Sequence, residues 1–183
     1  DYKTVFSDSI MLNVSRGCTR GCRFCMSSYL YRPLRETTIK ELVDIALKTR
    51  ENTNLNKITL IGAAVGDYYD LEGLTTALES EGFQIATPSL RIDSLSRETL
   101  ETLKKSGLKS ITIAPESIST LRERINKSIP DEKIFSVIKN AVDLDFNIKL
   151  YFLIGIPYES KEDIEELANY IEKIANMHKN RKY

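Results

Sequence analysis

The fold is decided by the stretch Ser9-Ile-Met-Leu-Asn-Val14-Ser-Arg-Gly-Cys18-Thr-Arg-Gly-Cys22-Arg-Phe-Cys25, in which an apolar segment runs directly into three closely spaced cysteines. The apolar segment predicts a short buried strand, and the cysteine-bearing segment predicts a loop at the C-terminal end of that strand. The 183 residues contain 3 cysteines, all of them in this loop. A disulfide framework would instead spread an even number of cysteines along the chain. The clustering therefore indicates a metal site.

Strand-like and helix-like segments alternate along the rest of the chain. Predicted strands cover residues 9–14, 57–65, 83–92, 110–114 and 147–156. Predicted helices cover residues 39–50, 71–80, 96–106, 119–127, 131–144 and 160–176, with Thr37 or Thr38 capping the first and Ser96 the third. Such units without a hairpin signal predict an α/β fold with a parallel sheet and helices outside it. Because a closed eight-fold barrel typically needs about 250 residues, we expect an open, curved, partial TIM-type barrel of about five βα units.

Composition and charge limit the classes of partner. Lysine and arginine number 26, as do aspartate and glutamate, so a net charge of zero gives no long-range field for nucleic acid or an anionic membrane. No apolar run approaches the roughly 20 residues of a membrane span, and the N-terminus lacks a secretory signal, so a cytoplasmic protein is expected. The chain opens on Asp1 and closes on polar residues, which suggests a fragment lacking upstream and downstream segments.

The number of cysteines constrains the kind of metal centre. A closed iron–sulfur site uses four protein thiolates, as in ferredoxins, whereas this chain offers only Cys18, Cys22 and Cys25. A 4Fe-4S cluster bound here would keep one iron without a protein ligand, and an open metal position is where a substrate or cofactor binds. Gly17 and Gly21 let the loop curl closely, and the arginines of the same stretch offset the negative charge of thiolates and sulfides.

The loop resembles the C-x3-C-x2-C signature of the radical S-adenosylmethionine superfamily, including the aromatic Phe24 before the last cysteine. The resemblance continues in the same order through residues 31–35, 113–117, 121–122, 125–127 and 149–160. It is closest to the subset whose members often carry an upstream cobalamin-binding domain. Residues 1–183 are therefore expected to form one radical S-adenosylmethionine core domain.

The resemblance implies a specific reaction. A reduced cluster passes one electron to S-adenosylmethionine, whose amino and carboxylate groups bind the open iron, and the C5′–sulfur bond breaks. The products are methionine and a 5′-deoxyadenosyl radical that abstracts hydrogen from a substrate the sequence does not reveal. An electron donor such as a ferredoxin or flavodoxin is implied. The chain has no Asp-x-His-x-x-Gly motif, so cobalamin would have to be held by a segment outside it.

The resemblance also implies where S-adenosylmethionine contacts the chain, at the C-terminal ends of the strands. Gly62, Ala63 and Ala64 occupy the place where many relatives have Gly-Gly-Glu, which contacts the amino group of the cofactor. The acidic residue is missing here, and Asp67 is a candidate substitute. Asp67 is equally well interpreted as part of an ordinary strand-to-helix loop.

Four further residues are implied in cofactor binding. Glu116 ends a predicted strand where the superfamily places a polar residue against the ribose or the amine, and Arg122 lies within reach of the carboxylate. Gly155 and Pro157 form a Gly-x-Pro turn that lies near the adenine in relatives. Glu116 and Arg122 could instead pair with each other or with solvent. No catalytic side chain is predicted.

Three more polar residues stand out. Arg91 and Lys149 lie on predicted strands and are expected to face the cavity, although a lysine near a strand end can also extend its amine to solvent. His178, the single histidine, is expected at the surface near the end of the last helix.

Several alternatives remain open from the sequence. A methylthiotransferase acting on RNA or a ribosomal protein would keep the same chemistry but needs further domains. An iron–sulfur module that only transfers electrons would keep the cluster without the radical. A structural zinc site would need a fourth ligand, for which only the distant His178 is available, and Cys22 with Cys25 also matches a redox C-x-x-C.

Overall fold

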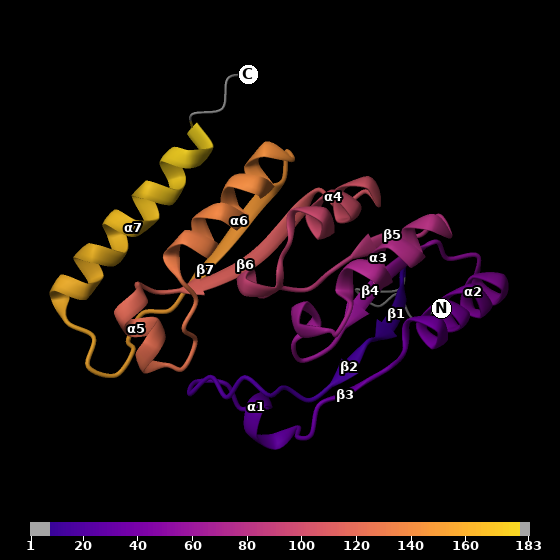
Figure 1. Ribbon diagram of the computed structural model, residues 1–183, viewed down its shortest axis with the longest axis horizontal. Helices are drawn as coiled ribbons and strands as arrows, with labels where there is room; N and C mark the ends of the chain where they lie inside the picture. Colours follow the sequence, from indigo (N-terminus) through magenta and orange to yellow (C-terminus); the bar gives the residue numbers. More distant parts are fainter. Residues whose placement is uncertain (1–7, 180–183) are drawn as a thin grey trace.

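The computed structural model describes residues 8–179. Its main strands are parallel and form an open, curved sheet (Figure 1). In spatial order they are β1 (Ile10–Asn13), β4 (Lys57–Ile61), β5 (Gln84–Ala86), β6 (Ser110–Glu116) and β7 (Asn147–Phe152). One isolated parallel bridge, between Leu90 and Ile113, joins the β1-β4-β5 part to the β6-β7 part. The sheet is the open partial barrel that the alternation of strands and helices predicts.

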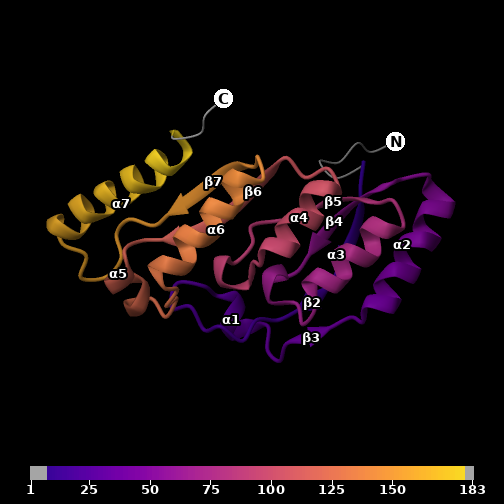
Figure 2. The same ribbon diagram turned by 45° about the horizontal axis from the view of Figure 1, so that its top comes forward.

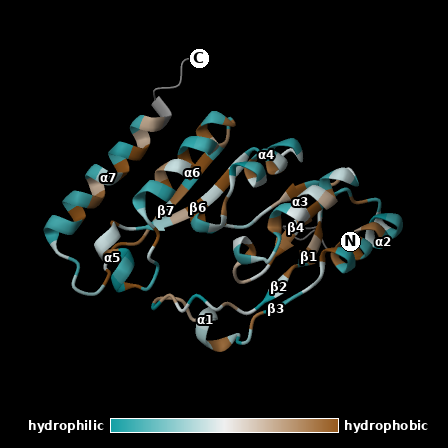
Figure 3. Ribbon diagram, viewed as in Figure 1, coloured by the Kyte–Doolittle hydropathy of each residue, from teal (hydrophilic) through white to brown (hydrophobic). Residues whose placement is uncertain are grey.

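The long helices lie in a row along the sheet (Figures 1 and 2). They are α2 (Ile39–Thr53), α3 (Leu71–Ser80), α4 (Arg97–Lys105), α6 (Asp131–Asp143) and α7 (Lys161–Lys179). Figure 3 shows hydrophobic residues on the strands and hydrophilic residues along the outer helix surfaces. In β1, Ile10 and Leu12 are buried in the core while Met11 and Asn13 are exposed. The helices therefore cover one face of the sheet, and the opposite, concave face stays open.

The structure adds one small antiparallel pair that the sequence did not predict. The short strands β2 (Ser15–Arg16) and β3 (Arg35–Glu36) pair antiparallel and flank the cysteine loop, which also contains the short helix α1 (Ser27–Leu30). Strands of two residues are too short to show the alternation of polar and apolar residues by which strands are recognised. This small ladder brings the two ends of the loop together.

Three predicted strands extend four or more residues beyond the strands of the structure. The predicted strand 57–65 ends at Ile61 and is followed by the 3₁₀ helix η1 (Val65–Asp67), and the predicted strand 147–156 ends at Phe152. Residues 83–92 form only the short β5 before the chain leaves the sheet and reaches the 3₁₀ helix η2 (Ile92–Ser94). A Cβ at Gly62 would lie 2.8 Å from the Ser15 hydroxyl, so the chain turns closely over the cysteine segment there. The predicted strands were too long because the turns that follow these strands also contain apolar residues.

The helix caps predicted from the sequence are present in the structure. Of the two threonines, Thr38 caps α2: its hydroxyl accepts a hydrogen bond from the Glu41 amide at 3.3 Å, and the Glu41 carboxylate accepts one from the Thr38 amide at 3.1 Å. Ser96 caps α4 by accepting a hydrogen bond from the Thr99 amide at 3.0 Å. The predicted helix 119–127 is shorter, forming α5 (Ser119–Arg124).

We predict that Gly17→Ala destabilises the fold by more than about 3 kcal/mol. Gly17 has a φ of +96°, and a Cβ there would overlap the Tyr31 carbonyl oxygen and lie 2.7 Å from that of Pro33. Gly107→Ala is the matched control, because Gly107 has a φ of +93° but open space around its Cβ, so only about 1–2 kcal/mol of backbone strain is expected. Urea unfolding of the cluster-free protein measures the free energy of unfolding of both variants. Equal losses of stability would contradict the close approach at Gly17.

Candidate metal and cofactor site

The three cysteines line one cavity at the C-terminal ends of the central strands. Its volume is about 220 Å³. The lining residues are Cys18, Arg20, Cys22, Phe24, Cys25, Ser28, Ala63, Ala64, Gly66, Ser89, Leu90, Arg91, Ala114, Glu116 and Lys127. All three thiols are free; Cys18 and Cys22 are buried and Cys25 is half-buried. Three reduced sulfur donors around a shared cavity fit the donor set of an iron–sulfur cluster.

The arrangement of the thiols bears on the zinc alternative. Among residues 8–179, no group of three or more histidine, cysteine, aspartate or glutamate side chains converges on one point that could hold a single metal ion. A zinc site needs its sulfur ligands about 2.3 Å from one ion. A cluster instead spreads its cysteine ligands over several irons. The three thiols would need a fourth ligand to complete a structural zinc site, whereas a cluster can leave one iron without a protein ligand.

Hydrogen bonds with the residues that follow α5 hold the cysteine loop in place. The Asn126 side-chain amide donates to the carbonyl oxygens of Arg20 at 3.1 Å and Gly21 at 2.9 Å. The Arg23 amide donates to the Ile125 carbonyl at 2.9 Å. Residues about a hundred positions apart in the sequence thus fix the loop between its first and last cysteines. The motif at residues 125–127 therefore has a structural role here.

Asp67 anchors the same loop and does not face the cavity as a free acid. Its carboxylate accepts two hydrogen bonds from Arg20, at 2.8 and 2.6 Å, and one from the Ser94 hydroxyl at 2.9 Å. The hydrogen bond to Asp67 raises the pKa of the Arg20 guanidinium further above its usual value. Because both carboxylate oxygens are occupied, the structure does not support Asp67 as the substitute for the missing acid near Gly62. The strand-to-helix-loop interpretation is the better one.

Arg91 faces the cavity, as predicted, and is held by a second carboxylate. Its guanidinium donates to both oxygens of Asp93, at 2.9 and 3.0 Å, and its remaining nitrogen lies 3.8 Å from the Cys22 sulfur. Burial opposes ionisation of Asp93, but the hydrogen bonds from Arg91 and the charge of Arg20 keep the pKa of Asp93 below its usual value. Lys149 differs: it is exposed on β7, with its amine 5.3 Å from the Tyr151 ring centre.

Glu116 reaches the cavity and pairs with Lys127. Its carboxylate lies 2.6 Å from the Lys127 amine, and both residues are buried. Glu116 has a φ of +68°, and the register of β6 against β7 shifts between Ile113 and Glu116. Strained backbone of this kind is found at functional sites. The sequence predicted Glu116 but missed Lys127, although Lys127 lies in one of the recognised motifs.

The structure places Arg122 away from the cavity, in contrast to the prediction that it meets the cofactor carboxylate. Arg122 is 0% exposed and donates to the Ser117 carbonyl, to the Ile129 carbonyl at 3.1 Å and to the Asp131 carboxylate. It also lies 5.8 Å from the ring centre of Tyr170. These contacts tie α5 to the start of α6 and to α7. Arg122 is therefore paired neither with Glu116 nor with solvent.

The small residues after β4 remain suited to close approach. Ala63 and Ala64 line the cysteine cavity, while Gly62 lies beside it and packs against Ser15. The structure describes no acidic group at the position where the recognised motif has glutamate. Backbone atoms are therefore the polar groups that this segment offers to a ligand.

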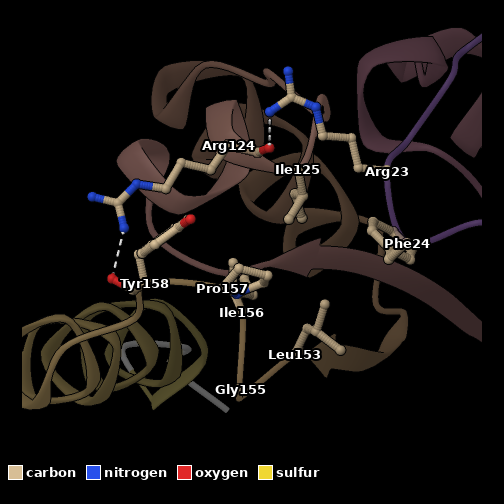
Figure 4. A pocket seen from close by; sticks show the side chains of 9 residues that line it. All are labelled: Arg23, Phe24, Arg124, Ile125, Leu153, Gly155, Ile156, Pro157 and Tyr158. Atoms are coloured by element: carbon tan, nitrogen blue, oxygen red, sulfur yellow. Dashed lines mark hydrogen bonds between the residues drawn. The ribbon is translucent and has the colours of Figure 1, made fainter.

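A second pocket, of about 480 Å³, adjoins the first at Phe24 (Figure 4). Its lining residues are Arg23, Phe24, Arg124, Ile125, Leu153, Gly155, Ile156, Pro157 and Tyr158. Arg124 donates to the Tyr158 carbonyl at 2.8 Å, and Arg23 donates to the Arg124 carbonyl. The turn with Gly155 and Pro157 therefore faces an apolar pocket bordered by the cysteine loop.

Comparison with known proteins agrees with this geometry. The Radical SAM superfamily profile matches residues 12–171. The chain belongs to the radical S-adenosylmethionine superfamily. The match includes the cysteine loop and every strand from β4 to β7. The family that the cysteine spacing and the later motifs indicated is thus confirmed.

Relatives of this superfamily member are longer proteins. MJ0966 of Methanocaldococcus jannaschii is 39% identical over 175 residues, covering 92% of this chain and 38% of that protein. Cytidylyl-2-hydroxyethylphosphonate methyltransferase of Streptomyces wedmorensis is 28% identical over 181 residues, covering 93% of this chain and 34% of that protein. Methylthiotransferases of ribosomal protein uS12 are also similar. The chain thus spans little more than a third of the first two relatives.

A solved structure confirms the architecture. The radical S-adenosylmethionine methyltransferase TsrM of Kitasatospora setae, solved with cobalamin and a [4Fe-4S] cluster, matches with a TM-score of 0.73 at 10% identity. The match covers 91% of this chain and 35% of TsrM. At this identity the likeness shows the fold. No helix among residues 8–179 is long and apolar enough to cross a membrane.

We predict that Arg122→Met destabilises the protein by about 3 kcal/mol, because it leaves buried carbonyls and Asp131 without their partner. Iron content after cluster assembly should stay at the wild-type level, because Arg122 lies outside the cavity. Arg97→Met is the control, since Arg97 forms an exposed pair with Glu101 at 2.9 Å and should cost less than about 0.5 kcal/mol. Urea unfolding and iron analysis give the two readouts. A stable variant that binds iron poorly would show instead that Arg122 belongs to the cofactor site.

Proposed function

We propose that this chain is the core of an enzyme that reductively cleaves S-adenosylmethionine at a 4Fe-4S cluster held by Cys18, Cys22 and Cys25. The observation that carries the proposal is the presence of three free thiols around one cavity, with no fourth cysteine in the chain. When bound, the cluster supplies one electron and an open iron for the cofactor. The product would be a 5′-deoxyadenosyl radical, used on a substrate that this chain does not identify.

The two adjoining cavities suggest how S-adenosylmethionine lies. The cysteine cavity contains Glu116, Lys127 and Arg91, which suit the charged methionine end of the cofactor. The second pocket, with Gly155 and Pro157, is mainly apolar and suits the adenine. Phe24 borders both cavities. We therefore assign Glu116 to the amine or ribose, Ala63 and Ala64 to close backbone contact, and the Gly155–Pro157 turn to the adenine.

Partners follow from the proposed chemistry. The cluster needs a one-electron donor, for which a ferredoxin or flavodoxin is the proposed class. Cobalamin, present in the TsrM structure, would be held by a segment outside this chain, as would much of the substrate site. Free cysteines suited to iron–sulfur chemistry favour a reducing compartment, and we propose the cytoplasm.

Two alternative functions would use the same cluster for a different reaction. A methylthiotransferase would consume S-adenosylmethionine and also transfer sulfur, which mass analysis of modified RNA or ribosomal protein detects. An electron-transfer module would accept an electron and release no 5′-deoxyadenosine. Glu116 and the second pocket favour a cofactor-binding enzyme over the electron-transfer module, because electron transfer needs neither.

The proposal is tested by assembling the cluster anaerobically and adding dithionite and S-adenosylmethionine. We expect about four irons per chain, as a 4Fe-4S cluster requires, and release of 5′-deoxyadenosine. Cys18→Ser, Cys22→Ser and Cys25→Ser should each abolish product above background, whereas Arg97→Gln should not change it. A cluster with full iron content and no 5′-deoxyadenosine would support the electron-transfer module.

A narrower prediction concerns Glu116. Glu116→Gln keeps the side-chain shape but removes the charge, so S-adenosylmethionine should bind about tenfold more weakly, as expected for the loss of a charge-assisted hydrogen bond. Iron content should not change, because Glu116 is not a cluster ligand. Glu101→Gln on the surface of α4 is the control. Equal binding constants for wild type and Glu116→Gln, measured by equilibrium titration, would remove Glu116 from the cofactor site.

A further inference from the structure

We propose that Arg91 is a positioning residue that donates a hydrogen bond to the Cys22 sulfur and so raises the reduction potential of the cluster. This inference rests on the proposed function, because it requires that Cys22 be a cluster ligand. Arg91 lies between the isolated bridge at Leu90 and η2, far from the cysteine loop in sequence.

The guanidinium of Arg91 has a fixed direction. Two of its nitrogens are occupied by the two oxygens of Asp93, at 2.9 and 3.0 Å, as a planar fork on a carboxylate. The third nitrogen, Nη1, therefore points away from Asp93, and it lies 3.8 Å from the Cys22 sulfur. The side chain is only 15% exposed. Arg91 thus presents one directed N–H to one cysteine.

The surroundings keep this fork in place. Asp93 is also paired with Arg20 at 3.2 Å, and Arg20 is a residue of the cysteine loop. The backbone of Arg91 packs closely against η1, because a Cβ added to Gly66 would lie 3.0 Å from the Arg91 amide nitrogen. Both the backbone and the side chain of Arg91 are therefore set by neighbours. The distance to Cys22 is consequently a property of the fold and not of a freely rotating side chain.

A positive hydrogen-bond donor beside a cluster ligand has a defined electrostatic effect. Reduction adds one negative charge to the cluster, and a nearby cation stabilises the reduced form more than the oxidised form. Arginine remains protonated at all accessible pH values, so the effect is permanent. Cys18 receives a different contact, from the neutral Ser28 hydroxyl at 3.6 Å. The charged contact on Cys22 therefore favours acceptance of an electron from the donor protein.

Arg91→Gln tests the proposal by redox titration of the assembled cluster, followed by electron paramagnetic resonance of the reduced form. The two proteins are compared at the potential where the wild-type cluster is half reduced. At that potential the ratio of reduced to oxidised cluster should be about tenfold lower in the variant. Losses of about this size are typical when a group that supports a metal ligand is removed. For one electron, a tenfold ratio corresponds to about 59 mV. Arg97→Gln makes the same chemical change at an exposed site and should leave the ratio unchanged.

A purely structural role for Arg91 gives a different result. It would lower iron content or the unfolding temperature, while the clusters that remain would titrate as in the wild type. Arg91→Lys keeps the charge but loses the fork on Asp93, so it should shift the ratio in the same direction by less. If Arg91→Gln does not assemble a cluster, redox titration of Arg91→Lys tests the proposal.

The outcomes separate this inference from the proposed function. If the wild-type protein assembles no cluster, the proposed function fails and this inference fails with it. If the wild-type cluster forms but Arg91→Gln and Arg91→Lys titrate identically to it, only the role of Arg91 is overturned. A lower ratio of reduced cluster in both variants, with normal iron content, supports the inference.

Discussion

A cluster held by three cysteine thiolates would bring negative charge to one small cavity, and much of the structure serves this constraint. The loop that carries them is closed at its base by the β2-β3 ladder and held from above by Asn126 at the end of α5. Positive charge is brought to the same place by Arg20 and Arg91, each fixed by a carboxylate. Because the chain has no net charge, this compensation has to be local.

The sequence predicts those parts of the structure that repeat a pattern over many residues. Alternating strands and helices, and the caps at Thr38 and Ser96, follow from periodicity and from side-chain chemistry at helix ends. The position of the cysteines predicts the cavity, because parallel strands place their C-terminal ends at one edge. These features depend mainly on local sequence, and they agree with the structure.

The remaining features depend on how side chains are oriented in the folded chain. Arg20, which occupies the Asp67 carboxylate, lies 47 positions away in the sequence. Ser117, Ile129 and Asp131 lie only 5, 7 and 9 positions from Arg122, but no sequence pattern shows that they surround its guanidinium. The pairing of Glu116 with Lys127 likewise appears only when the chain is folded. A charged residue in a motif can thus line the site itself or stabilise the elements around it, and only the tertiary structure distinguishes these two roles.

The sheet has a seam where Leu90 and Ile113 form an isolated bridge between its two parts. The cysteine cavity lies across this seam, since Ala63 and Leu90 line it from one part and Ala114 and Glu116 from the other. A molecule bound in the cavity therefore touches both parts of the sheet at once. Its affinity and the spacing of the two parts are then thermodynamically linked, so that residues along the seam influence binding without touching the bound molecule.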